Sequence, residues 1–155
     1  MENRPENLPI WYIVNVEGVV FRQEDNRYLM LVRGSGEKYL PGALSFPGGK
    51  VEGADFVDNV LEVTVRREIL EEVGVTVHDD ITYIESHSFV GDGEPCVDVV
   101  FLCRYKDGEA KSGDLDEVDS VIWMRYDEIL QNKDAPEWTK QSLIHAEKKR
   151  IKLKW

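Results

Sequence analysis

Residues 46–75, FPGGKVEGADFVDNVLEVTVRREILEEVGV, contain the pattern that decides the fold. A Pro-Gly-Gly turn and a polar segment come first, and apolar residues then recur at the spacing of a helix. Asp58 or Asn59 can cap this helix, and Asn59 with Glu62 forms a variant of the capping box. Gly74 stands where a left-handed glycine is expected to end it.

Three carboxylates share one face of the predicted helix, because Glu68, Glu71 and Glu72 are spaced i, i+3, i+4. They repel one another and lie near the helix C-terminus, where the macrodipole disfavours negative charge. A solvated acidic face is one interpretation, and a site for a hard divalent cation such as Mg²⁺ is the other. The opposite face is apolar and is expected to pack against a sheet: Val65, Ile69, Leu70 and Val73.

The segments on either side of this helix alternate between strands and helices without a regular βαβ period. We therefore expect an α/β (α+β) fold, a three-layer α/β/α sandwich with a mixed sheet, and a single domain over residues 1–155. The expected strands are Ile10–Phe21, Tyr28–Val32, Ile81–Val90, Cys96–Tyr105 and Val118–Met124, and the expected later helices are Tyr126–Gln131 and a segment from Pro136 to about Lys149.

The composition is that of a globular protein, and no apolar run approaches the ~20 residues that span a bilayer. The polar start, Met1 to Pro9, is not a secretory signal, so we expect a cytoplasmic protein. The net charge of −11 argues against nucleic-acid binding. The basic run at residues 148–154 is consistent with a solvated helix end, with contact to RNA or a membrane surface as the alternative.

The two cysteines and three histidines show no pattern of a disulfide or zinc site. Cys96 and Cys103 are seven residues apart in one expected strand, so their side chains point to opposite faces. We expect reduced, packed thiols and scattered histidines that are solvated or packed.

The segments Phe46–Glu52 and Arg67–Val75 closely resemble the Nudix box, a glycine turn followed by Arg-Glu-apolar-x-Glu-Glu-x-Gly-apolar. The resemblance implies a Nudix hydrolase that uses Mg²⁺, with Mn²⁺ as an alternative. Such an enzyme cleaves a phosphoanhydride bond in a nucleoside diphosphate linked to another group. Its partner would be a small-molecule nucleotide, and because members of the family are often dimers, a homodimer remains open.

One departure from the family pattern lies between the turn and the helix. The pattern places the arginine fourteen positions after the glycine, whereas 67 minus 49 is eighteen. Counting forward from Gly49 puts Asp55 at the position of the first family glutamate, and counting back from the arginine puts Asn59 there. Glu52, Asp55 or Asp58 can substitute for it, and the sequence does not choose among them.

The remaining site residues follow from the resemblance position by position. Glu68, Glu71 and Glu72 are the implied metal ligands, together with the Gly49 carbonyl. Arg67 orients the glutamates, and either Glu68 or Glu117 acts as the general base. Glu117 is chosen from the acidic stretch 114–118, for which an acidic surface turn is the alternative. The residues predicted to bind substrate are Arg33, Gly48, Gly49 and Lys50.

The substrate is less defined, with a nucleoside triphosphate or a nucleotide sugar preferred. Several aromatic residues are candidates to stack on a base, although aromatics in strands are more often core residues: Trp11, Tyr12, Tyr39, Phe89 and Trp138. One rival is a catalytically silent Nudix domain that acts as a nucleotide-binding regulator. A second is an interaction domain with an acidic helix by chance, and a third, isopentenyl diphosphate isomerase chemistry, lacks a suitably placed cysteine or histidine.

Overall fold

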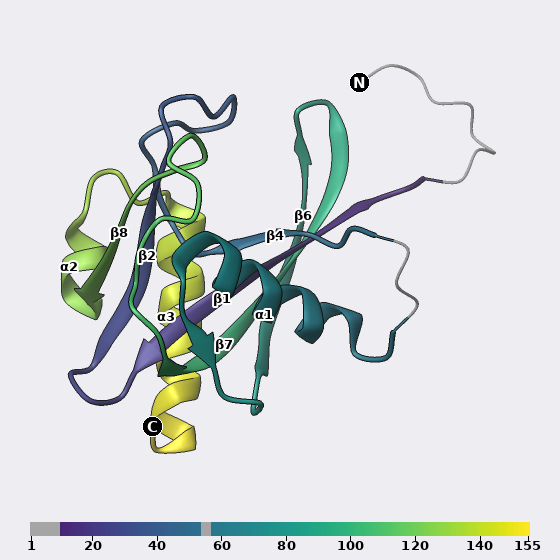
Figure 1. Cartoon of the computed structure of the whole chain (residues 1–155). Helices are drawn as coiled ribbons and strands as arrows, with labels where there is room; N and C mark the ends of the chain where they lie inside the picture. The colour runs from purple at the N-terminus through teal and green to yellow at the C-terminus, as the bar shows by residue number, and fades with distance from the viewer. Residues whose placement is uncertain (1–9, 54–56) are drawn as a thin grey trace.

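A computed structural model describes residues 10–53 and 57–155. A mixed sheet lies between helices on both faces, as predicted (Figure 1). The strands are β1 (Ile13–Arg22), β2 (Arg27–Arg33), β3 (Leu44–Ser45), β4 (Gly48–Lys50), β5 (Thr76–Val77), β6 (Thr82–Gly91), β7 (Glu94–Asp107) and β8 (Val118–Arg125). The helices are α1 (Val60–Val73), α2 (Tyr126–Gln131) and α3 (Glu137–Leu153).

The centre of the sheet is the parallel pair β1 and β7, which runs from Ile13↔Cys96 to Phe21↔Arg104. β6 pairs antiparallel with the outer side of β7, and β8 pairs antiparallel with β2. β1 and β2 form the predicted hairpin but pair only at its closed end, at Phe21↔Tyr28 and Arg22↔Arg27. Beyond that point β4 replaces β2 as the neighbour of β1, and β3 pairs with β2. The sheet therefore opens between β1 and β2.

Helix α1 covers one face of the sheet through its predicted apolar side, where Val65, Ile69 and Val73 are all fully buried. Leu70 was predicted to be buried with them but is 51% exposed. Leu70 is rotated by about 100° from Ile69 around the helix axis, so its side chain lies outside the contact between α1 and the sheet. Gly74 ends the helix in the left-handed conformation, with φ of 77° and its N–H donating to the Leu70 carbonyl, as predicted.

The N-terminus of α1 differs from the prediction. Asn59 is the N-cap, but it is left-handed, with φ of 54°, and its side chain makes no capping hydrogen bond. The expected pairing of Asn59 with Glu62 is therefore wrong, because a capping side chain needs an extended backbone to reach the helix N–H groups. At the other end of the chain, Pro136 is the N-cap of α3, just before the first helical turn where it was expected, and α3 continues beyond Lys149 to Leu153.

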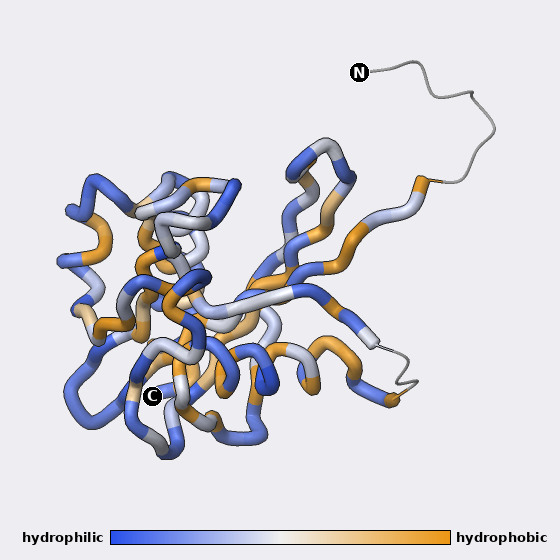
Figure 2. Tube along the Cα trace, turned by 45° about the horizontal axis from the view of Figure 1, so that its top comes forward, coloured by the Kyte–Doolittle hydropathy of each residue, from blue (hydrophilic) through white to orange (hydrophobic). Residues whose placement is uncertain are grey.

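Two apolar layers hold the sandwich together, one on each face of the sheet. The first joins α1 to β1, β2 and β7 through residues such as Val16, Leu31 and Ile69, and the second joins α2 and α3 to the opposite side through Phe21 and Leu143. The hydrophobic stretches lie mainly within the strands and helices (Figure 2). In residues 10–53 and 57–155, no helix combines the length and apolar composition needed to cross a bilayer.

Candidate active site

The glycine turn is held directly against the acidic helix. The Gly48 N–H donates a hydrogen bond of 3.0 Å to a carboxylate oxygen of Glu72. In the sheet, Gly48 pairs with Glu17 of β1, and a Cβ at Gly48 would lie 2.1 Å from the Val16 carbonyl oxygen. Only glycine allows the turn this close to β1. The close approach of β4 to β1 therefore sets the position of Glu72.

The second glycine of the turn leaves space for another carboxylate. A Cβ at Gly49 would lie 2.3 Å from Cδ of Glu68. Only 13% of the Glu68 side chain is exposed, so it lies in the angle between β4 and α1. The two glycines thus place two glutamates of one helix face beside the backbone of the turn.

Arg67 lies among the glutamates. Its Nη1 is 3.0 Å from Glu68 Oε1 and 3.3 Å from Glu71 Oε2. Glu71 is the outermost of the three, with 58% of its side chain exposed. The guanidinium therefore orients two carboxylates, while Glu72 is oriented by the turn.

The loop before β8 closes the end of α1. The Lys111 N–H donates to the Val73 carbonyl and the Gly113 N–H to the Glu72 carbonyl, each at 3.0 Å. These bonds satisfy carbonyls that would otherwise lack partners at the helix end. The same loop carries Glu117, which lies next to β8 and contributes to the charge felt by Glu72. Glu117 is therefore brought to the acidic face of α1.

The carboxylates border a common cavity of about 260 Å³ that is lined by Glu68, Glu71, Glu72, Gly113, Asp114, Glu117 and Val118. Carboxylate oxygens dominate this lining, and they are the ligands that Mg²⁺ prefers. Among the residues that the structure describes, no three His, Cys, Asp or Glu side chains are already gathered at metal-binding spacing. The residue types fit a magnesium site, and ligation would require these side chains to turn from their present hydrogen bonds toward the cavity.

Burial and mutual repulsion disfavour the ionised forms of these carboxylates. Burial raises the pKa of Glu72 to about 8, and the charges of Glu68 and Glu117 add to the effect. Burial also raises the pKa of Glu68, although Arg67 opposes the shift. Carboxylates whose ionised form is disfavoured in the free protein gain most from a bound cation.

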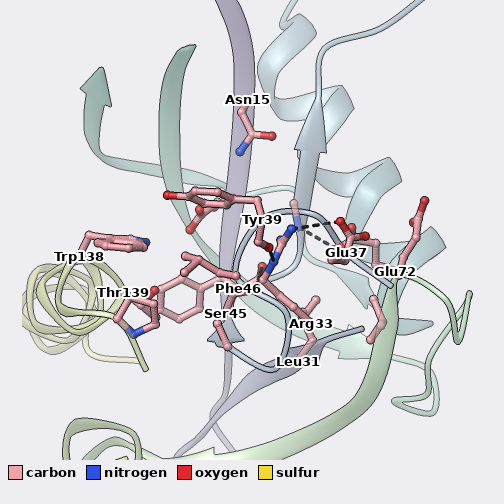
Figure 3. Close-up of a pocket in the computed structure, with 17 residues that line it drawn as sticks. Asn15, Leu31, Arg33, Glu37, Tyr39, Ser45, Phe46, Glu72, Trp138 and Thr139 are labelled. Atoms are coloured by element: carbon pink, nitrogen blue, oxygen red, sulfur yellow. Dashed lines mark hydrogen bonds and ion pairs between the residues drawn. The ribbon is translucent and has the colours of Figure 1, made fainter. Parts of the chain in front are cut away.

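A second pocket, of about 130 Å³, shares Glu72, Glu117 and Val118 with the cavity of carboxylates and extends into the opening between β1 and β2. Figure 3 shows rings at one end, from Tyr39, Phe46 and Trp138, and charged groups at the other. Arg33 lies at the charged end, where it donates to the Tyr39 carbonyl and to Glu37. Of the predicted substrate-binding residues, Arg33 and Gly48 line this pocket.

Sequence reasoning missed the polar residues of this pocket, Asn15, Glu17 and Glu37. Asn15 and Glu17 lie in β1, whose composition indicated only a strand. Their alternation with the buried Val16 was the available signal, because it places two polar groups on one face of a central strand.

Other predicted residues lie outside both cavities. Lys50 is an exposed residue of β4 and lines neither cavity, so its assignment to substrate binding gains no support from its position. Trp11 is 79% exposed and, like Tyr12 and Phe89, lies outside both linings. Of the candidates for the first family glutamate, Asp55 lies outside the described residues, whereas the charge of Glu52 raises the pKa of Glu68.

A family profile described as NUDIX domain matches residues 12–145, so the chain belongs to the Nudix family. The predictions of family and fold are confirmed, and the match supports the predicted enzyme class, a Nudix pyrophosphohydrolase. The comparison with curated proteins gave no match.

Solved structures with the same fold come from several organisms. A MutT NUDIX hydrolase from Burkholderia pseudomallei is 24% identical, with a TM-score of 0.71 over 87% of this chain and 98% of that one. A MutT protein from Methanosarcina mazei Go1 is 21% identical, with a TM-score of 0.74 over 93% and 99%. The NUDIX domain of Shewanella oneidensis NrtR, solved with ADP ribose, is 20% identical, with a TM-score of 0.71 over 97% and 94%.

Proposed function

We propose that this protein is a magnesium-dependent pyrophosphohydrolase that cleaves a phosphoanhydride bond in a nucleoside diphosphate linked to another group. The observation that carries the proposal is the shared border of the two cavities. Glu72 and Glu117 belong both to the cavity of carboxylates and to the pocket with aromatic rings. A nucleotide whose base lies in the pocket with aromatic rings would thus direct its phosphates toward the carboxylates.

Glu68, Glu71 and Glu72, with the Gly49 carbonyl, would hold the cation. Bound magnesium supplies Lewis-acid polarisation of a phosphoryl oxygen and lowers the pKa of a bound water. Arg67 holds Glu68 and Glu71 in place by charge-assisted hydrogen bonds. Without the cation, a chain with a net charge of −11 repels a phosphorylated substrate, which is why substrate binding itself should depend on magnesium.

The proton of the attacking water needs an acceptor near this border. Glu68 and Glu117 are the candidates, since both line the cavity of carboxylates, and Glu117 also reaches the substrate pocket. Arg33 is placed to bind a phosphate at the charged end, in exchange for part of its present pairing with Glu37. We propose a nucleoside triphosphate or a nucleotide sugar as the substrate.

The test is a substrate panel with Mg²⁺ or Mn²⁺, read as phosphate released after phosphatase coupling. The panel contains nucleoside triphosphates, oxidised dGTP, nucleotide sugars, dinucleoside polyphosphates, coenzyme A and ADP ribose, the last because it was solved with the S. oneidensis domain. The expected result is one dominant substrate whose hydrolysis is abolished by EDTA. No turnover of any compound by folded, metal-binding protein would instead favour a nucleotide-binding regulator.

A further inference from the structure

The pocket with aromatic rings contains a feature that metal-assisted hydrolysis does not require. Asn15 and Glu17 line it and alternate along β1 on the same side as Val19 and Phe21, which are buried in the apolar layer beneath α3. These two polar residues interrupt the apolar layer and line the pocket. Their polar groups are therefore available to a ligand.

Asp98 of β7 interacts with the side chains of both residues. Asn15 and Asp98 are register partners in the parallel pair, and the Asn15 amide nitrogen donates to Asp98 Oδ1 at 2.7 Å. Asp98 is only 7% exposed and is also hydrogen bonded to the Glu17 carboxyl. Burial and the charge of Asp98 raise the pKa of Glu17 well above its usual range.

This bonding pattern determines what the pocket presents to a ligand. Because the Asn15 amide nitrogen donates to Asp98, its amide oxygen remains free to accept a hydrogen bond. The Glu17 carboxyl offers an acceptor oxygen in either protonation state. The pocket wall therefore offers two neighbouring acceptors.

The aromatic end of the pocket indicates what kind of ligand group would bind beside these acceptors. Phe46 is 3% exposed and forms part of the pocket lining, whereas Tyr39 is 48% and Trp138 is 51% exposed. The rings lie on the side of the pocket away from Glu72 (Figure 3). Partly exposed rings beside a buried one form a surface on which a planar heteroaromatic ring can stack.

We propose that this pocket binds the base of the nucleotide and that Asn15 and Glu17, held by Asp98, select a base whose edge carries adjacent N–H donors. The inference rests on the proposed function and narrows its substrate class to guanine nucleotides. Guanine presents its ring N–H beside its amino group, whereas adenine presents its amino group beside a ring acceptor. If a base places an acceptor atom against Asn15 or Glu17, two acceptors face each other and neither forms a hydrogen bond. Such a base binds less well.

The experiment compares GTP, ITP and ATP as substrates with Mg²⁺. ITP lacks only the amino group of GTP, so it isolates one of the two expected hydrogen bonds. We expect kcat/KM for GTP to exceed that for ITP about tenfold, the effect of one hydrogen bond lost with its acceptor left buried. ATP should be weaker than ITP. Values for GTP, ITP and ATP within threefold of one another would overturn the inference.

Three variants assign the selectivity to the pair. Asn15→Leu removes one acceptor at nearly constant volume and should reduce the GTP preference to less than threefold. Glu17→Gln should retain the preference, because its amide can donate to Asp98 and still present an oxygen. Glu94→Gln is the control, since this exposed residue lies at the start of β7, outside both cavities. A preference unchanged by Asn15→Leu would overturn the assignment.

Binding of guanosine, inosine and adenosine in EDTA, measured by calorimetry, separates this inference from the proposed function, because these nucleosides carry no phosphate and need no magnesium. Selective guanosine binding without hydrolysis of any triphosphate would support the base pocket and contradict the enzyme. Hydrolysis with no discrimination among bases would support the enzyme and contradict the base pocket.

Discussion

Helices α1 and α3, which cover opposite faces of the sheet, differ in how their carboxylates are compensated. On the α1 face, burial raises the pKa of Glu68 and of Glu72, and neighbouring glutamates add to both shifts. On the α3 face, burial would also raise the pKa of Glu147, but hydrogen bonds from Arg150 and Tyr28 lower it instead. Burial is common to both faces, so the sign of the shift depends on the partners that the fold supplies.

A second carboxylate of the α3 face shows the same behaviour. Glu85 of β6 accepts hydrogen bonds from Ser142 at 2.7 Å and from His145 at 2.5 Å, and these bonds outweigh burial and lower its pKa. His87 is also 3.2 Å from this carboxylate. The comparison suggests that compensated carboxylates fasten α3 to the sheet, whereas the α1 carboxylates remain available to an external cation.

The largest expected effect is the loss of activity when a carboxylate on the α1 face is replaced. Glu72→Gln should lower kcat/KM by about 10³-fold or more, because it removes a charged ligand while an amide can still accept from the Gly48 N–H. Its melting temperature should fall little. Steady-state kinetics and thermal denaturation measure the two effects.

Glu147→Gln is the matched change on the α3 face. It should leave kcat/KM unchanged but reduce the free energy of unfolding by about 1.5–3 kcal/mol, the value of hydrogen bonds to a charged group. If both variants lose activity equally, or both lose only stability, the distinction between the two faces is wrong.

Magnesium should stabilise the folded protein by about 2.7 kcal/mol when its concentration is one hundred times its dissociation constant. For a chain of 155 residues this corresponds to a rise in Tm of roughly 5–10 °C. Glu72→Gln should abolish most of the rise, whereas Glu147→Gln should retain it from a lower starting Tm. An equal rise in wild type and Glu72→Gln would place the cation elsewhere.

The adjacent glycines allow a sharper test of the turn. Gly48→Ala brings a Cβ against the Val16 carbonyl and should destabilise the fold by about 1–3 kcal/mol, because backbone cannot yield easily. Gly49→Ala meets only the end of the Glu68 side chain, so it should displace that carboxylate at little cost in stability. We expect urea denaturation to distinguish Gly48→Ala and kinetics to distinguish Gly49→Ala. The reverse pattern would contradict the geometry of the turn.

A further expected effect is the pH dependence of stability in EDTA. Glu72, with a folded-state pKa of about 8 against an ordinary value of 4.5, favours folding as pH falls through 8, because the folded state then binds the extra proton. Glu147 has a lowered pKa, so its contribution is present above the ordinary value and is lost as pH falls through the folded-state pKa. The free energy of unfolding, measured by denaturation at a series of pH values, should therefore lose its dependence on alkaline pH in Glu72→Gln. It should lose part of its dependence on acid pH in Glu147→Gln.

The sequence alone predicted the family, the sandwich and most element boundaries, because these depend on local patterns. Glu68, Glu71 and Glu72 share a helix face by spacing alone, and Gly74 ends the helix by its conformational freedom. The four-residue insertion before α1 was also visible, but its structural consequence was not, since Asp55 lies outside the described residues.

Only the tertiary structure decided what lies beside that helix. In the sequence, Asn15 and Glu17 show only an ordinary strand pattern. In the structure, β1 separates from β2 and pairs with β4 and β7, and this arrangement places both residues in a pocket beside Asp98. Glu85 of β6 likewise acquired its partners from α3, and Glu147 of α3 acquired Tyr28 of β2. Spacing along the chain determines which residues share a face, whereas strand pairing over long separations determines which faces meet.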